Sequence, residues 1–241
     1  MRVSRQQVLH RTVRAHALGR LAKDPVEAVR RAAGIYATPP SIHLGLALRV
    51  RDYQPTMLDR ELLERRTLVR TPAVRGSVYV LPVDWVSAAL TLTLVKPLIT
   101  ILATRGVSEP AYAKLADRIE ATLADGHKSS AEIQAALGKH LPDELAISGV
   151  LRRMSHEGRI VRTKVRGGAK SQSYEYARMS DWVDLPPRPS RAEALALLAR
   201  PWVLANGPAT IADLAWWAMV PQKDARPALA AIGAREVEVE G

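Results

Sequence analysis

The sequence predicts a mainly α-helical protein with small β-hairpins, an α+β fold made of similar modules in tandem. Apolar residues recur at helical spacing through most of the 241 residues. Around Gly76 and around Gly167–Gly168 the pattern changes to alternation, which is typical of a hairpin. Groups of helices are therefore expected to alternate with short antiparallel ribbons along the chain.

The clearest module is predicted for residues 108–185. Residues 111–126, 129–138 and 142–158 each carry apolar positions on one helical face, and alternating residues follow over 159–179. Three helices and then a hairpin with a basic, glycine-rich tip make a winged-helix pattern. In such a module the second helix of the helix-turn-helix enters the major groove of DNA. The hairpin, or wing, is expected to contact the DNA backbone or the minor groove.

The last helix and the wing of this module carry a cluster of basic residues. The helix is expected to turn one face inward (Leu145, Val150, Leu151, Met154) and another outward (Arg152, Arg153, His156). The wing holds almost no acidic residue before Glu175, and Tyr174 and Tyr176 are expected to pack along one face of it. Against the alternative of a solvated basic face, we expect phosphate contacts from Arg152, Arg153, Arg162, Lys164, Arg166 and Lys170.

A first, more elaborate module is predicted for residues 1–107. Its helices are expected over 4–19, 24–37 and 43–50, a helix and a hairpin over 56–82, and apolar helices over 83–106. Asp24 is the expected N-cap of the second helix, with Pro25 in its first position. Arg70 and Arg75 flank the hairpin tip, where Gly76 allows close backbone approach, and we expect both to bind DNA phosphates. The alternative is a solvated hairpin edge.

A third, truncated module is predicted for residues 190–241, after the stiff proline-rich linker 186–190. Three helices lead to the alternating stretch AREVEVEG, which stops where a return strand is due, so we expect a longer natural protein. Trp216 and Trp217 point about 100° apart on their helix. One of them is expected in the core and the other against a neighbouring module.

The composition limits the classes of function. Lys and Arg total 35 against 24 Asp and Glu, a formal charge of +11, which favours a polyanionic partner. No cysteine is present and the six histidines are scattered, so we expect no metal and no other cofactor. No apolar run is long enough to span a membrane, and no secretory signal begins the chain. We expect a cytoplasmic, nucleoid-associated protein and, because no heptad repeat is visible, a monomer.

Three longer stretches resemble one known family. They are GIYATPPSIHLGLALRVRDY (34–53), ELLERRTLVRTPAVRGSVYVLP (61–82) and GPATIADLAWWAMVPQKDAR (207–226). The chain resembles, over nearly its whole length, the winged-helix DNA glycosylases of the azinomycin-resistance and interstrand-crosslink repair type. The resemblance implies tandem winged helices that bind alkylated or crosslinked double-stranded DNA. It also implies hydrolysis of the N-glycosidic bond of N7-alkylated purines, with water as the nucleophile and without a cofactor.

The resemblance places the catalytic positions at Tyr36 and Thr38. Family members carry Gln-x-Gln or Gln-x-Asp there, and these side chains hold the catalytic water; this sequence departs from the pattern at both positions. Tyrosine and threonine hydroxyls can still hydrogen-bond a water. The alternative is that Tyr36 and Thr38 are only the end of a helix and the start of a turn. Asp52 and Asp84 are the nearest acidic residues that would replace a missing base, with capping as their alternative role.

Two further residues belong to the same region. Tyr79 stands where the family usually has histidine, and His43 lies close to the candidate motif in the sequence. The leading hypothesis is a monofunctional DNA glycosylase. The alternative is a winged-helix DNA-binding protein or regulator that has lost the chemistry together with the usual motif.

Overall fold

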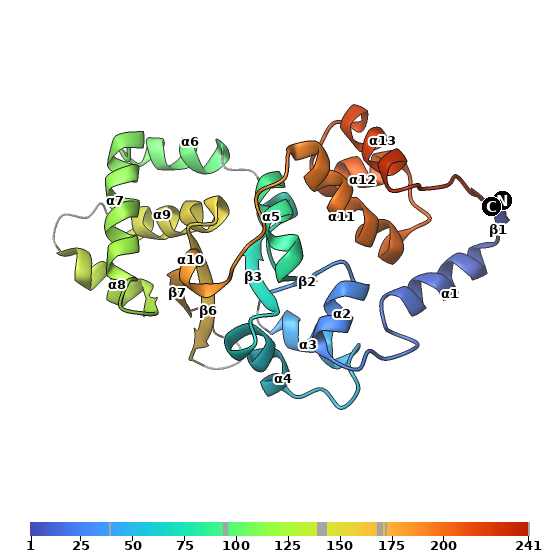
Figure 1. Cartoon of the computed structure of the whole chain (residues 1–241), viewed down its shortest axis with the longest axis horizontal. Coiled ribbons are helices and arrows are strands. Elements are labelled where there is room, and N and C mark those ends of the chain that lie inside the picture. Colours follow the sequence, from blue (N-terminus) through green and yellow to red (C-terminus); the bar gives the residue numbers. More distant parts are fainter. Residues whose placement is uncertain (39, 94–95, 139–143, 168–170, 172, 241) are drawn as a thin grey trace.

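The computed structural model describes residues 1–38, 40–93, 96–138, 144–167, 171 and 173–240. Figure 1 shows three groups of helices along the long axis of the molecule. Helices α6–α10 lie at one end, the sheet with β2 and β3 lies near the middle, and α11–α13 lie on the other side of it with α1 beyond them. The mainly helical α+β class is confirmed.

The first group of elements holds a three-stranded antiparallel sheet in the order β2-β4-β3. Its elements are β1 (Arg2–Val3), α1 (Arg5–Ala15), α2 (Pro25–Arg31), β2 (Ile35–Tyr36), α3 (Ser41–Ala47), α4 (Pro55–Asp59), a π-helical turn (Arg60–Glu64), β3 (Leu68–Pro72), a 3-10 turn (Val74–Gly76), β4 (Val78–Pro82) and α5 (Val83–Leu92). Helix α6 (Lys96–Thr104) follows α5 but packs against the second group. The predicted cap of α2 is confirmed, because the Asp24 carboxylate accepts a hydrogen bond from the amide of Glu27.

The second group is the winged helix that the sequence predicts for the middle of the chain. It contains α7 (Glu109–Thr122), β5 (Lys128–Ser129), α8 (Ser130–Leu137), α9 (Glu144–Glu157), β6 (Ile160–Arg166), β7 (Ser173–Arg178) and α10 (Met179–Trp182). Its sheet has the order β5-β7-β6. Ser129 caps α8 in a capping box with Glu132, and α8 ends at Gly138 with a φ of 71°. Lys170 at the tip of the wing and the side chain of Leu145 lie outside the described residues.

The third group contains α11 (Arg191–Asn206), α12 (Ile211–Ala218), α13 (Gln222–Ala231) and β8 (Glu238–Val239). The last strand does not begin a new wing here. It pairs in parallel with β1, with Arg2 opposite Glu238, and an ion pair of 2.8 Å joins these two side chains. The two ends of the described chain therefore lie side by side, as Figure 1 shows.

One apolar core crosses the module boundaries that the sequence suggests. Helix α5 packs along α11, and the first hairpin and the second wing share the same core. Its members include Val69, Leu81, Leu90, Val161, Trp182, Leu195, Trp202 and Leu214. Leu102 of α6 likewise lies in the core of the second group. A Cβ on Gly149 of α9 would meet Leu102 at 3.0 Å, so this glycine allows the two helices to pack closely.

No single helix among the described residues is long and apolar enough to cross a membrane. Helices α5 and α6 reach the required length and composition only when they are taken together as a bent pair.

Two residues of α9 that were expected to face outward are buried. Arg153 donates to both oxygens of Glu109 at 2.6 and 2.8 Å and to Glu157 at 2.8 Å. Its guanidinium also lies 3.6 Å from the centroid of the Tyr112 ring. Arg153 is therefore a structural residue that fastens α9 to α7, and the expected DNA contact is corrected. The spacing of apolar residues along α9 does not show that α7 places the Glu109 carboxylate opposite Arg153.

His156 fastens α9 to the first group of elements. Its side chain is 2% exposed, and its Nδ1 lies 2.9 Å from the hydroxyl of Thr93, the residue that ends α5. Burial, together with the nearby charges of Arg152 and Arg162, lowers the pKa of His156 to about 4. The folded protein therefore holds this imidazole in its neutral form at neutral pH.

The low pKa of His156 predicts acid sensitivity of the fold. Below about pH 6.5 the unfolded chain binds a proton at this histidine, whereas the folded chain does so only near pH 4. The free energy of unfolding should therefore fall as the pH drops from 7 to 4, by about 2 kcal/mol through this residue. Urea denaturation of the wild type and of His156→Gln at several pH values measures this slope. His16 and His43 also have lowered pKa values but are unchanged in the variant, so parallel slopes would contradict the prediction.

Candidate functional site

Tyr36 and Thr38 lie on and just after an edge strand rather than at a helix end. Helix α2 ends at Arg31, and the chain then turns through Gly34, whose φ is 97°. A Cβ at Gly34 would meet the Leu81 side chain at 2.7 Å, so only glycine fits this turn. The turn delivers the segment into the ladder of β4, where the amide of Ala37 donates to Val78 at 2.9 Å. Tyr36 is consequently 47% exposed, and Thr38 is half-buried.

The neighbour of Tyr36 across the ladder is Tyr79. The two residues are paired in register, and their rings meet edge to face with centroids 6.0 Å apart. Burial raises the pKa of the Tyr79 phenol, and Arg75 opposes this shift. Tyr79 therefore presents a neutral phenol that packs against the candidate residue Tyr36.

Arg70 is not a free phosphate ligand. It is 4% exposed, and it donates from β3 to the backbone carbonyl of Thr163 on β6. Its guanidinium lies 5.2 Å from the centroid of the Tyr174 ring. The expected DNA contact at Arg70 is corrected: this arginine joins the hairpin of the first group to the wing of the second. Local sequence places Arg70 on a strand but does not show that a second hairpin covers it.

Tyr174 is the centre of the arginine cluster that results. Arg162 lies 5.3 Å from the centroid of this ring, on the same hairpin. The Nε of Arg162 is buried and has no hydrogen-bond partner within the described part of the chain. Burial raises the pKa of the Tyr174 phenol, and Tyr36 is close enough to contribute to this rise. The arginine cluster therefore lies beside the candidate motif, although the two are far apart in the sequence.

The remaining predicted DNA ligands fall into two groups. Arg152 and Lys164 are exposed and make no hydrogen bond or ion pair to another described residue. Arg166 is exposed but paired with Glu175 at 2.8 Å and with Glu132 at 3.2 Å. The free cations near the site are thus fewer than the sequence pattern predicts, and those at Arg152, Arg162 and Lys164 remain available for a phosphate.

The structure brings a carboxylate to this region that sequence reasoning missed. Asp59, at the end of α4, influences the titration of Arg70, His43 and Tyr53. His43 and Tyr53 form a pair, with Nδ1 2.8 Å from the phenol oxygen, and burial lowers the pKa of the histidine. Asp59 sits in an ordinary charged helix pattern, so no local signal distinguishes it.

The two acidic residues considered from the sequence occupy other places. Both oxygens of Asp84 bind the guanidinium of Arg30, at 2.6 and 3.1 Å. Asp52 is exposed in a turn with a φ of 49°. Asp84 is therefore engaged in an ion pair with a residue of α2. No cluster of three or more potential metal ligands occurs in the described part of the chain.

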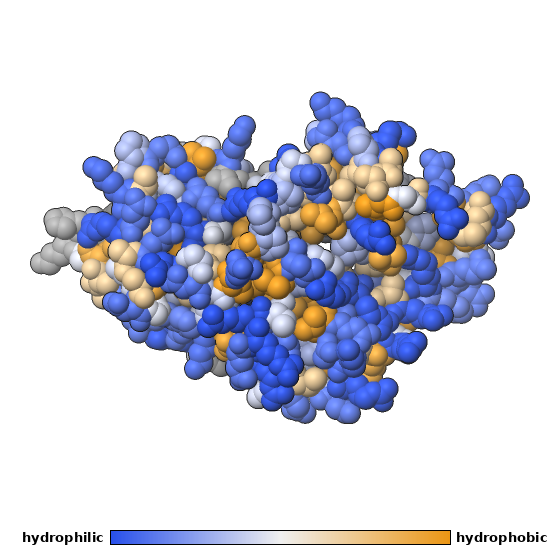
Figure 2. Space-filling model, in the orientation of Figure 1, coloured by the Kyte–Doolittle hydropathy of each residue, from blue (hydrophilic) through white to orange (hydrophobic). Residues whose placement is uncertain are grey.

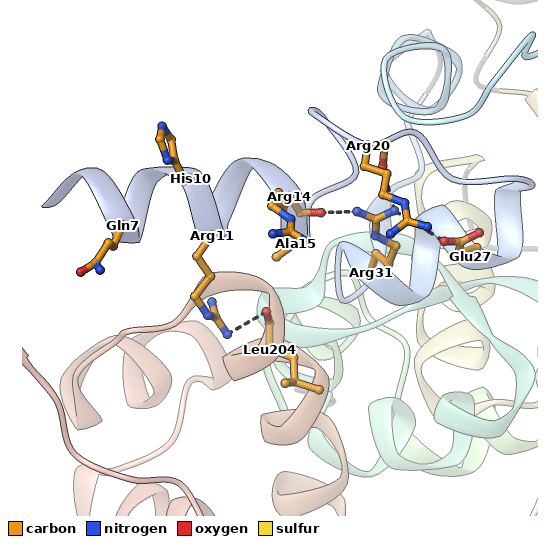
Figure 3. A pocket seen from close by; sticks show the side chains of 9 residues that line it. All are labelled: Gln7, His10, Arg11, Arg14, Ala15, Arg20, Glu27, Arg31 and Leu204. Atoms are coloured by element: carbon orange, nitrogen blue, oxygen red, sulfur yellow. Dashed lines mark hydrogen bonds and ion pairs between the residues drawn. The ribbon is translucent and has the colours of Figure 1, made fainter. Parts of the chain in front are cut away.

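A separate basic pocket lies between α1 and α2 (Figure 3). Its volume is about 670 Å³, and its lining includes Arg11, Arg14, Arg20, Arg31 and one carboxylate, that of Glu27. Two of these arginines serve the fold: Arg11 donates to the carbonyl of Leu204 at 3.1 Å, and Arg31 donates to that of Arg20 at 2.8 Å. These contacts hold α1 in place, although no residue of α1 is fully buried.

Figure 2 shows one face of the whole molecule, on which hydrophilic residues prevail and apolar residues gather mainly near the centre and toward α11–α13. Over the molecule as a whole, the exposed large apolar side chains include Leu204 and Trp216.

Comparison with known proteins identifies the fold and the family. The family model described as DNA glycosylase AlkZ-like matches residues 6–241. Among solved structures, Streptomyces sahachiroi DNA glycosylase AlkZ matches with a TM-score of 0.78 and 22% identity, over 100% of this chain and 69% of that chain. At this level of identity the structural match shows a shared fold. No curated protein matches the chain.

The burial of Arg70 predicts a loss of stability when it is shortened. Arg70→Ala leaves the Thr163 carbonyl without its partner and removes a cation from the Tyr174 ring, which should cost about 3 kcal/mol. Urea denaturation measures this cost. Arg152→Ala, on an exposed guanidinium, is the matched control and should change stability by less than about 0.5 kcal/mol. Equal stability of the two variants would contradict the structural role of Arg70.

Proposed function

Because the chain belongs to the AlkZ-like DNA glycosylase family, we propose that it excises N7-alkylated purines from double-stranded DNA with water as the nucleophile. Family membership makes the chain a DNA glycosylase, a hydrolase of N-glycosyl bonds that binds DNA. A regulator without chemistry is the weaker alternative. The substrate class, the site residues and the path of the DNA are parts of the proposal.

The observation that carries the assignment is the display of two hydroxyls on the edge strand β2 and the bend that follows it. Tyr36 and Thr38 are two residues apart, and the ladder to β4 continues between them through Ala37. Side chains at such spacing in an extended segment point to the same side. Tyr36 and Thr38 alternate with the buried Ile35 and Ala37, so we infer that both hydroxyls face the same side, where each can accept or donate a hydrogen bond to a shared water.

An N7-alkylated purine is a suitable substrate for a site that has hydroxyl groups in place of a strong general base. The alkyl group gives the purine a positive charge, so the bond from N9 to C1′ breaks with its electron pair moving onto the base, which becomes neutral. The sugar passes through an oxocarbenium-like state, water adds to C1′, and its proton passes to the surrounding solvent. The protein then needs to place the water rather than to ionise it fully, which hydroxyl groups can do.

Cations that no described carboxylate neutralises supply the proposed contacts to the DNA backbone. Arg152, Arg162 and Lys164 lie on the third helix and the wing of the second group, and Arg75 lies at the tip of the first hairpin. Phosphate contacts of this kind orient a protein on the duplex without reading its sequence. We expect a monomer to bind alkylated or crosslinked DNA in this way.

Removal of the two hydroxyls should slow base release. Tyr36→Phe and Thr38→Ala should each reduce single-turnover release of N7-methylguanine from duplex DNA by about tenfold, and the double variant by more, because a misplaced water attacks less often. Tyr176→Phe, on the second wing, is the control that removes a phenol elsewhere. Full activity of the double variant would overturn the assigned site. Absence of release by the wild type would overturn the proposed substrate.

The salt dependence of binding tests the assigned phosphate contacts. Arg152→Ala and Lys164→Ala should each lower the slope of log K against log salt by about 1, because one fewer counterion is released. Arg166→Ala should leave the slope nearly unchanged, since Glu132 and Glu175 already neutralise this residue. Fluorescence anisotropy with a labelled duplex at several salt concentrations gives the slopes. If Arg152→Ala and Lys164→Ala have the same slope as the wild type, these residues do not contact the DNA backbone.

A further inference from the structure

Trp216 is an exposed indole in a protein whose other tryptophans are partly or fully buried. It lies on α12 and is 68% exposed, whereas Trp182 and Trp202 are 4% and 7% exposed. Trp85 and Trp217 are half-buried, and Trp217 stacks on Trp202 with centroids 5.5 Å apart. The expected division of the tryptophan pair is thus found, with Trp217 beside the core and Trp216 directed toward another module.

The contact that Trp216 makes there is with the tip of the first hairpin. The guanidinium of Arg75 lies 4.0 Å from the centroid of the indole, and its Nη1 donates to the backbone carbonyl of Trp216 at 2.9 Å. Arg75 has a φ of 61°, a conformation rarely adopted by a residue with a side chain. The hairpin tip therefore holds a cation against one part of the ring, and most of the indole remains in solvent.

A row of side chains connects this indole with the candidate motif. Arg75 and Tyr79 lie on the same hairpin, close enough for the guanidinium to oppose the rise in the Tyr79 pKa that burial causes, and the Tyr79 ring meets that of Tyr36 edge to face. Trp216, Arg75, Tyr79 and Tyr36 thus follow one another from α12 to the edge strand. An arginine beside aromatic faces is the combination with which proteins bind unpaired nucleobases, because every base has a π-face and is attached to a phosphate.

We propose that Trp216 stacks on an unpaired nucleobase of the bound DNA, and that Arg75 holds the indole in place and contacts the neighbouring phosphate. The ligand is the π-face of a base at a disrupted base pair, whichever base it is. This inference rests on the proposed function, because excision needs a base to leave the stack and therefore exposes another. Trp216 would stabilise the opened duplex beside Tyr36 and Thr38.

Quenching of tryptophan fluorescence by acrylamide tests the contact directly. The difference between the wild type and Trp216→Phe gives the contribution of the exposed indole. This contribution should disappear when the protein binds a duplex with one tetrahydrofuran abasic-site analogue, which leaves a base unpaired without any base release. If the quenched component is the same with and without this duplex, Trp216 does not contact the DNA and the inference is wrong.

Binding affinities separate stacking from a structural role. Trp216→Ala should bind the abasic duplex about tenfold more weakly and an undamaged duplex less than about twofold more weakly, and Trp216→Phe should keep most of the affinity. The slope of log K against log salt should stay unchanged in Trp216→Ala and fall by about 1 in Arg75→Ala. Leu197→Ala, on α11, removes another exposed apolar side chain as a control. Equal losses on both duplexes, or none, would overturn the inference.

The same samples distinguish this inference from the proposed function. Protection of Trp216 by the abasic duplex without any release of N7-methylguanine would remove the proposed substrate and keep the stacking contact. The glycosylase assignment would stand and the stacking contact would be rejected if Trp216→Ala released N7-methylguanine at the wild-type rate and the abasic duplex left Trp216 of the wild type open to acrylamide.

Discussion

A buried guanidinium between two hairpins sets the geometry of this protein. Arg70 extends from the first hairpin, donates to a carbonyl of the second, and lies over the ring of Tyr174. A buried cation without such partners would be costly, so the two hairpins have one favourable relative position. In that position Arg162 and Tyr174 come to lie beside Tyr36, from which they are separated by more than a hundred residues in the chain. The candidate site therefore depends on how the first hairpin packs against the second.

The shared apolar core fixes the third group in the same frame. Because α5 packs along α11, the helices that follow are placed over the first hairpin, and α12 meets its tip. The stacking of Arg75 on Trp216 adds a polar contact between the hairpin tip and α12. Apolar burial supplies most of the energy for such an arrangement, whereas the directional contacts select one orientation. An exposed indole within this rigid frame has little conformational entropy to lose when a flat ligand covers it.

The absence of the usual amide and carboxylate at the motif changes the demands on the rest of the site. Tyr36 and Thr38 can orient a water but are poor bases near neutral pH, because a tyrosine titrates near about 10. The positive charge of an N7-alkylated purine lowers the barrier to bond cleavage before the protein contributes anything. Asp59 supplies negative charge near Arg70 and His43, and Asp84 is held by Arg30. A divergent motif is therefore compatible with the hydrolysis that defines the family, provided that the substrate is already activated.

The sequence by itself determined most of the helices, several of their caps and both hairpins, because these depend on neighbours within a few residues; it did not show that the predicted helix 24–37 ends at Arg31 and gives way to an edge strand. The capping box at Ser129, the proline after Asp24 and the alternation of the wing are all local signals. Similarity over three longer stretches also indicated the family. The tertiary structure alone decided which arginines are free. Arg152 and Arg153 are adjacent in sequence, yet one faces solvent and the other is enclosed by two glutamates, because successive helical residues point about 100° apart and only packing decides which direction another helix covers.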